Sequence, residues 1–126
     1  MTTENSPSVQ PSQNSDASVD ASASLGESIE RHLRLTLARH LKNASSREIW
    51  MATCYAVRDR IVDRFIRTQE KHSEAKTRRV YYLSLEYLMG RLLNSNLCNS
   101  GVLADAKVAL KDLGYELDEL LEEEHD

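Results

Sequence analysis

The sequence predicts a mainly α-helical chain with one core β-strand, and three observations support this fold class. Two capping-box patterns, Ser24 with Glu27 and Ser45 with Glu48, each stand before an apolar stripe of helical period. One short apolar run, residues 79–85, carries Val and Tyr side chains without that period, which is typical of a buried strand. The 126 residues are 40% hydrophobic and 29% charged, as in an ordinary globular protein.

The N-terminal segment differs in composition from the rest of the chain. Its first 23 residues are mostly Ser, Thr, Asn, Gln, Asp and Ala, and the first basic residue of the chain is Arg31. Such a segment cannot bury enough apolar surface to offset the entropy lost on ordering. We therefore expect residues 1–26 to form a disordered polar tail, with order beginning near the Ser24 capping box, and residues 27–126 to contain the fold.

Two helices are predicted after the tail. The first has about four turns, because Ile29, Leu33, Leu37 and Leu41 repeat every four residues. The second is the longest and runs from about residue 46 to residue 73. Its apolar stripe is broad enough to contact more than one neighbour, and consists of Trp50, Cys54, Val57, Ile61 and Phe65.

The opposite face of the long helix is rich in charge. Residues 47–79 contain nine basic and five acidic residues. This pattern fits a solvated helix face with opposite charges as neighbours, or an anion site on which several arginines converge. The sequence leaves both open. His32 and His40, near the edges of the first stripe, are expected to be surface or hydrogen-bonded residues rather than ligands.

The second half of the chain is predicted to hold the strand and three shorter helices. The strand at residues 79–85 leads through Gly90 into a helix with Met89, Leu92, Leu93 and Leu97, which ends at Gly101. Another helix starts near residue 103 and ends at Gly114, and a short acidic helix follows with Leu117, Leu120 and Leu121. A single strand has no partners for its backbone groups, so we interpret the chain as part of a larger protein.

Several classes of function are disfavoured by composition. A net charge of −4 argues against a nucleic-acid binder, and no apolar run is long enough to span a membrane. The start of the chain does not have the pattern of a secretory leader, so Cys54 and Cys98 are expected to be reduced thiols in the cytoplasm. The acidic residues of 112–126 lie too close together in sequence to predict a metal cage.

The strand region carries a specific resemblance. Residues 79–91, RVYYLSLEYLMGR, are similar to the N-terminal signature of the α-1,4-glucan phosphorylases, the family of glycogen, starch and maltodextrin phosphorylase. Residues 31–37, 56–59 and 65–69 resemble the first two helices of that family, and the resemblance extends through the acidic run at 122–124. It implies that residues 27–126 are an incomplete part of a Rossmann-like N-terminal α/β domain, in a two-domain glycosyltransferase B type fold.

The resemblance also implies an activity. Members of the family cleave terminal α-1,4 bonds of a glucan with inorganic phosphate and release glucose 1-phosphate. They use pyridoxal phosphate on a lysine that lies far beyond residue 126, and they are typically homodimers. We therefore expect a cytoplasmic enzyme of which this fragment alone is inactive and binds no cofactor. The alternative is a stand-alone helical interaction or dimerisation module derived from a phosphorylase.

Three site residues follow from the resemblance. Glu86 matches the glutamate that lines the pocket beside bound glucose, although a salt bridge to Arg91 or another arginine is an equal alternative. Arg67 and Gln69 match residues of the AMP effector site of the animal enzymes. The aromatic residue that stacks on the adenine is replaced by Ser73, and the tail has no basic segment around a serine. We therefore predict neither activation by AMP nor a phosphoserine switch.

Overall fold

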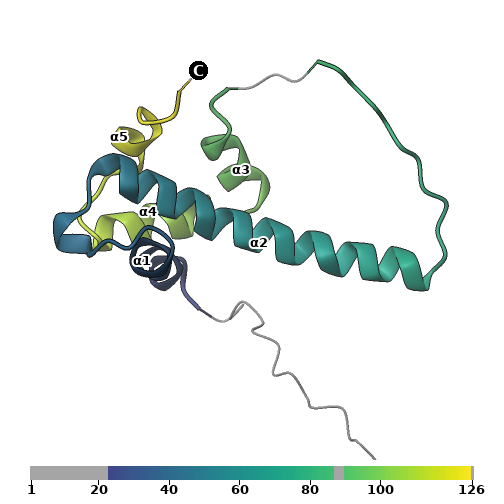
Figure 1. Ribbon diagram of the computed structural model, residues 1–126, viewed down its shortest axis with the longest axis horizontal. Coiled ribbons are helices and arrows are strands. Elements are labelled where there is room, and N and C mark those ends of the chain that lie inside the picture. The colour runs from purple at the N-terminus through teal and green to yellow at the C-terminus, as the bar shows by residue number, and fades with distance from the viewer. Residues whose placement is uncertain (1–22, 87–89, 126) are drawn as a thin grey trace, which may run out of the picture.

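The chain folds around one long helix. The structure, a computed structural model, describes residues 23–86 and 90–125. Figure 1 shows the other helices gathered around the N-terminal half of α2, while its C-terminal half projects away from them. The helical elements are α1 (Leu25–Leu35), the short 3-10 helix η1 (Leu41–Asn43), α2 (Ser46–Glu74), α3 (Leu93–Asn99), α4 (Leu103–Asp112) and α5 (Leu117–Leu121).

The core lies where α1, α4 and α5 meet the first half of α2. Ile29 of α1, Ile49 of α2 and Leu110 of α4 are fully buried, and Leu97 of α3 closes one side. Burial of such side chains is the main stabilising contribution to a domain of this size. The full set of buried apolar residues is Leu25, Ile29, Leu33, Ile49, Ala52, Ala56, Val57, Leu93, Leu97, Val102, Ala106, Leu110, Leu117 and Leu120.

Both predicted capping boxes are confirmed. The Ser24 amide donates to Glu27 Oε2 at 2.7 Å, and the Glu27 amide donates to Ser24 Oγ at 3.2 Å. The same exchange joins Ser45 and Glu48, at 2.9 and 3.3 Å. These bonds satisfy amide groups that have no partner within a helix, and so fix where α1 and α2 begin. The predicted long helix is also confirmed, since α2 ends one residue beyond the expected position.

The first helix is shorter than predicted. The apolar stripe extends to Leu41, but α1 ends at Leu35 and the backbone turns at Ala38, which has a positive φ of 54°. The amides of Thr36 and Leu37 both donate to His32 O, at 2.9 and 3.0 Å, and close the helix end. Leu37, in the turn, and Leu41, in η1, still pack against the core. The apolar pattern therefore predicted their contact with the core correctly, although these residues do not belong to α1.

The three C-terminal helices agree with the prediction. Gly101 follows α3 with φ of 72°, and Gly114 follows α4 with φ of 88°. Glycine adopts this left-handed conformation without the strain that a Cβ atom brings, so it ends each helix cleanly. The first residue predicted for the third helix, Met89, lies outside the described residues. The predicted tail also lies outside them as far as residue 22, and α1 begins at Leu25.

The predicted core strand is wrong for this structure. Residues 77–84 run without regular structure from the end of α2 toward α3, and no strand occurs in the parts of the chain that are described (Figure 1). The side chains of Val80, Tyr82 and Leu83 are about nine-tenths exposed, at 89%, 89% and 92%. An isolated extended segment has no neighbour for its backbone hydrogen bonds and cannot form a sheet alone. A Rossmann-like sheet is therefore not observed among these residues.

Candidate functional site

The predicted pocket residue Glu86 lies at the end of the exposed extended segment. The Ser84 hydroxyl accepts from the Glu86 amide at 3.2 Å and donates to Glu86 O at 3.0 Å, which makes a local turn. The Glu86 side chain is exposed. Its alternative role as a partner of Arg91 is not seen, because Arg91 Nη1 lies 3.2 Å from Glu122 Oε1 and the ion pairs found between described residues do not include Glu86.

Two carboxylates after α5 join the C-terminal end of the described chain to the start of α3. We call Glu122 and Glu124 the carboxylate clasp. Glu122 pairs with Arg91, while Glu124 Oε1 accepts from the Leu92 amide at 2.7 Å and Glu124 Oε2 accepts from the Leu93 amide at 3.1 Å. Leu92 is the N-cap of α3 and offers no side-chain oxygen, so a distant residue supplies the cap.

The clasp was not predicted from the sequence. The spacing of the acidic residues at 112–126 does not distinguish Glu124 from its neighbours. The start of α3 nevertheless carries a signal in the sequence. The helix that starts near Leu93 lacks a Ser, Thr, Asp or Asn at its N-cap, so its free amides required an acceptor from elsewhere in the chain.

A second contact holds the same C-terminal segment against the start of α2. Arg47 Nη1 lies 3.2 Å from His125 Nε2 and 3.5 Å from Glu123 O. The Arg47 guanidinium also lies over the Trp50 ring, with its carbon 5.7 Å from the ring centroid, within the range of a cation–π contact. The segment that follows α5 is thus attached on one side to α2 and on the other to α3.

The two predicted effector residues lie on the projecting half of α2. Arg67 forms an ion pair with Asp63, one turn earlier on the same helix. Gln69 is half-buried, and Ser73 one turn later is exposed. Residues two positions apart point to different sides of a helix, so Arg67 and Gln69 do not form a joint site on α2 alone.

The basic face of α2 does not form a convergent anion site. Its arginines are used singly: Arg64 donates to Ser100 O at 2.8 Å, Arg60 donates to Ala23 O at 3.2 Å, and Arg58 lies 3.9 Å from Asp59. Each of these contacts joins neighbouring residues or fastens another segment to α2. Of the two alternatives drawn from the charge pattern, the structure supports a helix face with local partners.

His32 is a hydrogen-bonded residue at the contact between α1 and α2, as predicted. Its Nε2 lies 2.9 Å from Asp59 Oδ2 and its Nδ1 lies 2.9 Å from Thr36 Oγ1. The ring is buried and stacks on Tyr55 with centroids 5.6 Å apart. Arg31 also reaches Asp59, at 3.0 Å. Buried polar groups need such partners, so this cluster fixes the packing of the two helices.

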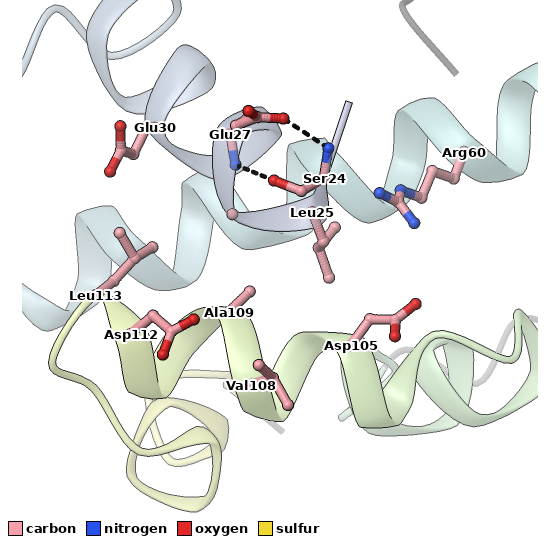
Figure 2. A pocket seen from close by; sticks show the side chains of 11 residues that line it. Ser24, Leu25, Glu27, Glu30, Arg60, Asp105, Val108, Ala109, Asp112 and Leu113 are labelled. Atoms are coloured by element: carbon pink, nitrogen blue, oxygen red, sulfur yellow. Dashed lines mark hydrogen bonds between the residues drawn. The ribbon is translucent and has the colours of Figure 1, made fainter. Parts of the chain in front are cut away.

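A cleft of about 610 Å³ lies between the start of α1, the middle of α2 and one face of α4. Figure 2 shows Leu25 of α1 and Ala109 of α4 between these two helices. The carboxylates of Glu27, Asp105 and Asp112 also line the cleft. Glu30 adds a fourth carboxylate, and Arg60 is the one basic residue that lines the cleft. None of the residues predicted for a site lines this cleft.

The described residues offer neither a metal site nor a membrane-spanning helix. They contain no group of three or more His, Cys, Asp or Glu side chains that could hold a metal ion. They also contain no helix that is long and apolar enough to cross a bilayer. The two cysteines, Cys54 and Cys98, are free thiols.

The comparisons with known proteins identify relatives of this chain. The chain is 40% identical over 104 residues to the brain form of glycogen phosphorylase from Bos taurus, and 40% identical over 108 residues to the liver form from Homo sapiens. These matches cover 82% and 86% of this chain. No family model matches the chain.

Identity at this level over most of the chain shows common descent, and the chain belongs to the α-1,4-glucan phosphorylase family. The match covers only a small part of each relative. It spans only 12% of the bovine brain form and 13% of the human liver form. The chain therefore corresponds to about an eighth of the length of the curated relatives.

Proposed function

We propose that this chain is the N-terminal part of a glucan phosphorylase that cleaves terminal α-1,4-glucosidic bonds with inorganic phosphate and releases glucose 1-phosphate. The observation that carries the proposal is the 40% identity to glycogen phosphorylases over 82–86% of the chain. The whole enzyme takes an α-1,4-glucan and phosphate as substrates, acts as a homodimer, and works in the cytoplasm, where its free thiols stay reduced. The chain by itself is inactive.

The exposed apolar segment supports this proposal on physical grounds. Tyr81, Tyr82, Leu83 and Leu85 are between 78% and 102% exposed, and they lie next to one another in an extended backbone. A protein rarely leaves so continuous an apolar run in water unless another surface covers it. We infer that residues 79–85 become a strand when the rest of the phosphorylase supplies neighbouring strands on either side.

Pyridoxal phosphate has no suitable place in the described part of this chain. The lysines Lys42, Lys71, Lys76, Lys107 and Lys111 are all exposed, whereas a lysine that holds this cofactor requires an enclosed pocket. The cofactor, whose phosphate group supplies acid–base chemistry toward the substrate phosphate, would therefore be held by another part of the enzyme. The contribution of this chain is Glu86, a carboxylate that accepts hydrogen bonds from sugar hydroxyls.

A second function is favoured by a different observation, the self-contained core. Helices α1, α2, α4 and α5 bury their apolar faces against one another, and residues such as Ile29, Ile49 and Leu110 are fully enclosed. A chain that forms this core alone can persist as a folded interaction or dimerisation module. Its docking surface would be the exposed segment 79–85, and its partner a phosphorylase subunit.

A chimera tests the proposed activity. The residues of bovine brain glycogen phosphorylase that match this chain are replaced by those of the chain, and phosphorolysis of maltoheptaose is measured. We expect the chimera to release glucose 1-phosphate and the 126-residue chain supplied with pyridoxal phosphate to release none. A folded chimera with bound cofactor and no activity would contradict the proposal, and activity of the chain alone would contradict the claim of inactivity.

The same chimera tests Glu86. A hydrogen bond between a charged group and a substrate hydroxyl contributes about 1.5–3 kcal/mol, so Glu86→Gln should lower kcat/KM about 10- to 100-fold. Glu70→Gln is the matched control, because Glu70 is an exposed carboxylate on the projecting part of α2. If the Glu86 and Glu70 variants were equally active, Glu86 would not be a residue of the substrate pocket.

A further inference from the structure

Residues 78–86, which we call the pairing segment, stand apart from the helices (Figure 1). Among the described residues, no backbone group of this segment bonds to another backbone group, and the last such bond before it runs from the Thr77 amide to His72 O. The apolar side chains of Val80, Tyr82 and Leu83 are exposed along it. Extended backbone with free amides and carbonyls is a template on which another strand can pair.

The two ends of the pairing segment carry opposite charges. Arg78 and Glu86 are both exposed, and the ion pairs found between described residues include neither of them. Each lies four residues from Tyr82. Because side chains alternate along extended backbone, Arg78, Tyr82 and Glu86 belong to the same face of a strand. A strand with opposite charges at equal distances from its centre is complementary to a second copy of itself that runs in the opposite direction.

Symmetry limits the register of such a pair. Two identical antiparallel strands are related by a two-fold axis only when one residue lies opposite its own copy. With Tyr82 on the axis, Arg78 of each copy lies opposite Glu86 of the other. With Leu83 on the axis, Val80 would lie opposite Glu86 and both ion pairs would be lost. Charge therefore favours the register centred on Tyr82.

The backbone fits this register. The Ser84 hydroxyl already binds the amide and the carbonyl oxygen of Glu86, at 3.2 and 3.0 Å, so Glu86 needs no backbone bond from a partner. It can therefore occupy a non-hydrogen-bonded position of an antiparallel pair, where facing Cα atoms lie about 4.5 Å apart and side chains are closest. Tyr82 has the same parity and would meet its own copy in an aromatic contact.

We propose that this chain forms a symmetric homodimer in which the pairing segments of two copies join as antiparallel strands centred on Tyr82. The inference goes beyond the proposed activity and does not depend on it. In a complete phosphorylase, the neighbouring strands inferred above would occupy the same strand edges. Pairing of two copies and incorporation into the enzyme's sheet therefore exclude each other.

The first part of the test uses charge reversal in the 126-residue chain. Sedimentation velocity over a range of concentrations should show a monomer–dimer equilibrium. Arg78→Glu and Glu86→Arg should each raise the dimer Kd about tenfold, because like charges then face each other across the strands. The double variant restores opposite charges and should return the Kd to within about threefold of the native value. Glu70→Arg is the matched control, since it changes the charge equally at an exposed site on α2 and should leave the Kd unchanged.

The second part tests the register by disulfide formation. In a chain that carries Cys98→Ser, the variant Tyr82→Cys places two thiols opposite each other, and oxidation should yield a covalent dimer. The control is Val80→Cys, whose two copies would lie about 14 Å apart along the strands and should cross-link at least about tenfold more slowly.

Several results would overturn the proposal. A chain that stays monomeric at every concentration has no such pairing, and a chain that assembles into larger species has no closed two-fold pairing. A double variant as weak as the single variants would remove the ion pairs, and equal cross-linking at positions 80 and 82 would remove the register. Unchanged far-ultraviolet circular dichroism of each variant shows that the helices remain folded.

Discussion

Cys54 shows how local surroundings set the reactivity of a side chain in this chain. It lies on α2 beside the cavity that separates α2 from α3. Burial raises the pKa of the Cys54 thiol to about 12, and the nearby Glu124 carboxylate acts in the same direction because it disfavours a second negative charge. Cys98, near the end of α3, is exposed. The two cysteines should therefore differ in reactivity.

We predict that iodoacetamide modifies Cys98 well before Cys54. The thiolate is the nucleophile, and a thiol with a pKa of about 12 is almost fully protonated at pH 8, so modification of Cys54 should be more than about a hundredfold slower. Its rate should rise about tenfold for each unit of pH up to the pKa. Mass spectrometry of the two tryptic peptides measures both rates. Equal rates in the folded chain would contradict the buried position of Cys54.

The polar contacts between residues close in sequence could be predicted, whereas those between distant residues could not. Ser45 and Glu48 are three residues apart, so the chemistry of a capping box is visible in the sequence. In the folded chain the Ser45 amide, and after it the Arg39 side chain at 2.7 Å, lower the pKa of Glu48. Glu124 and Leu92 meet only because α5 and α3 pack on the same part of the molecule, and no local pattern records that.

At the scale of elements, α2 has two different halves. Its buried residues, Ile49, Ala52, Thr53, Ala56 and Val57, all lie in the first twelve positions. Further along the helix, Phe65 is 60% exposed and Ile66 is 49% exposed. The sequence predicted one stripe along the whole helix. Its period was right, but only half of the stripe finds neighbours among the described residues, so helical periodicity alone could not show where burial ends.

This difference predicts a gradient of amide exchange along α2. Amides of residues 50–58 should exchange only through opening of the core, whereas those of residues 66–74 should exchange at least a hundredfold faster through local fraying. NMR on the 126-residue chain at neutral pH measures this. In the chimera the second half should become protected, because the apolar residues Phe65 and Ile66 would gain neighbours. Uniform protection in the isolated chain would contradict the structure.

The strand prediction failed for a reason that also belongs to this scale. Residues 79–85 have the composition of a buried strand. A helix satisfies its own backbone groups, so α2 needs no neighbouring segment for its backbone hydrogen bonds. A strand depends on neighbours, and here no extended partner lies among the described residues. Propensity therefore predicted the helices better than the strand.

At the scale of the whole molecule, the core predicts that the chain unfolds as a unit. Leu110 on α4 is fully buried, while Val108 on the same helix is 61% exposed. The buried positions come from all the α-helices, so loss of one large side chain should weaken every contact in the cluster. The sequence predicted which helices carry apolar faces, but not that α4 packs against α1.

Leu110→Ala should lower the free energy of unfolding by about 2–5 kcal/mol, since it removes transfer free energy and leaves a cavity. Val108→Ala is the matched control on the same helix and should change stability by less than about 0.5 kcal/mol. Urea unfolding followed by far-ultraviolet circular dichroism measures both. A single cooperative transition with this difference would support a self-contained core, as the interaction-module function requires. A broad transition in which the two variants behave alike would mean that the core is completed only by the rest of a phosphorylase.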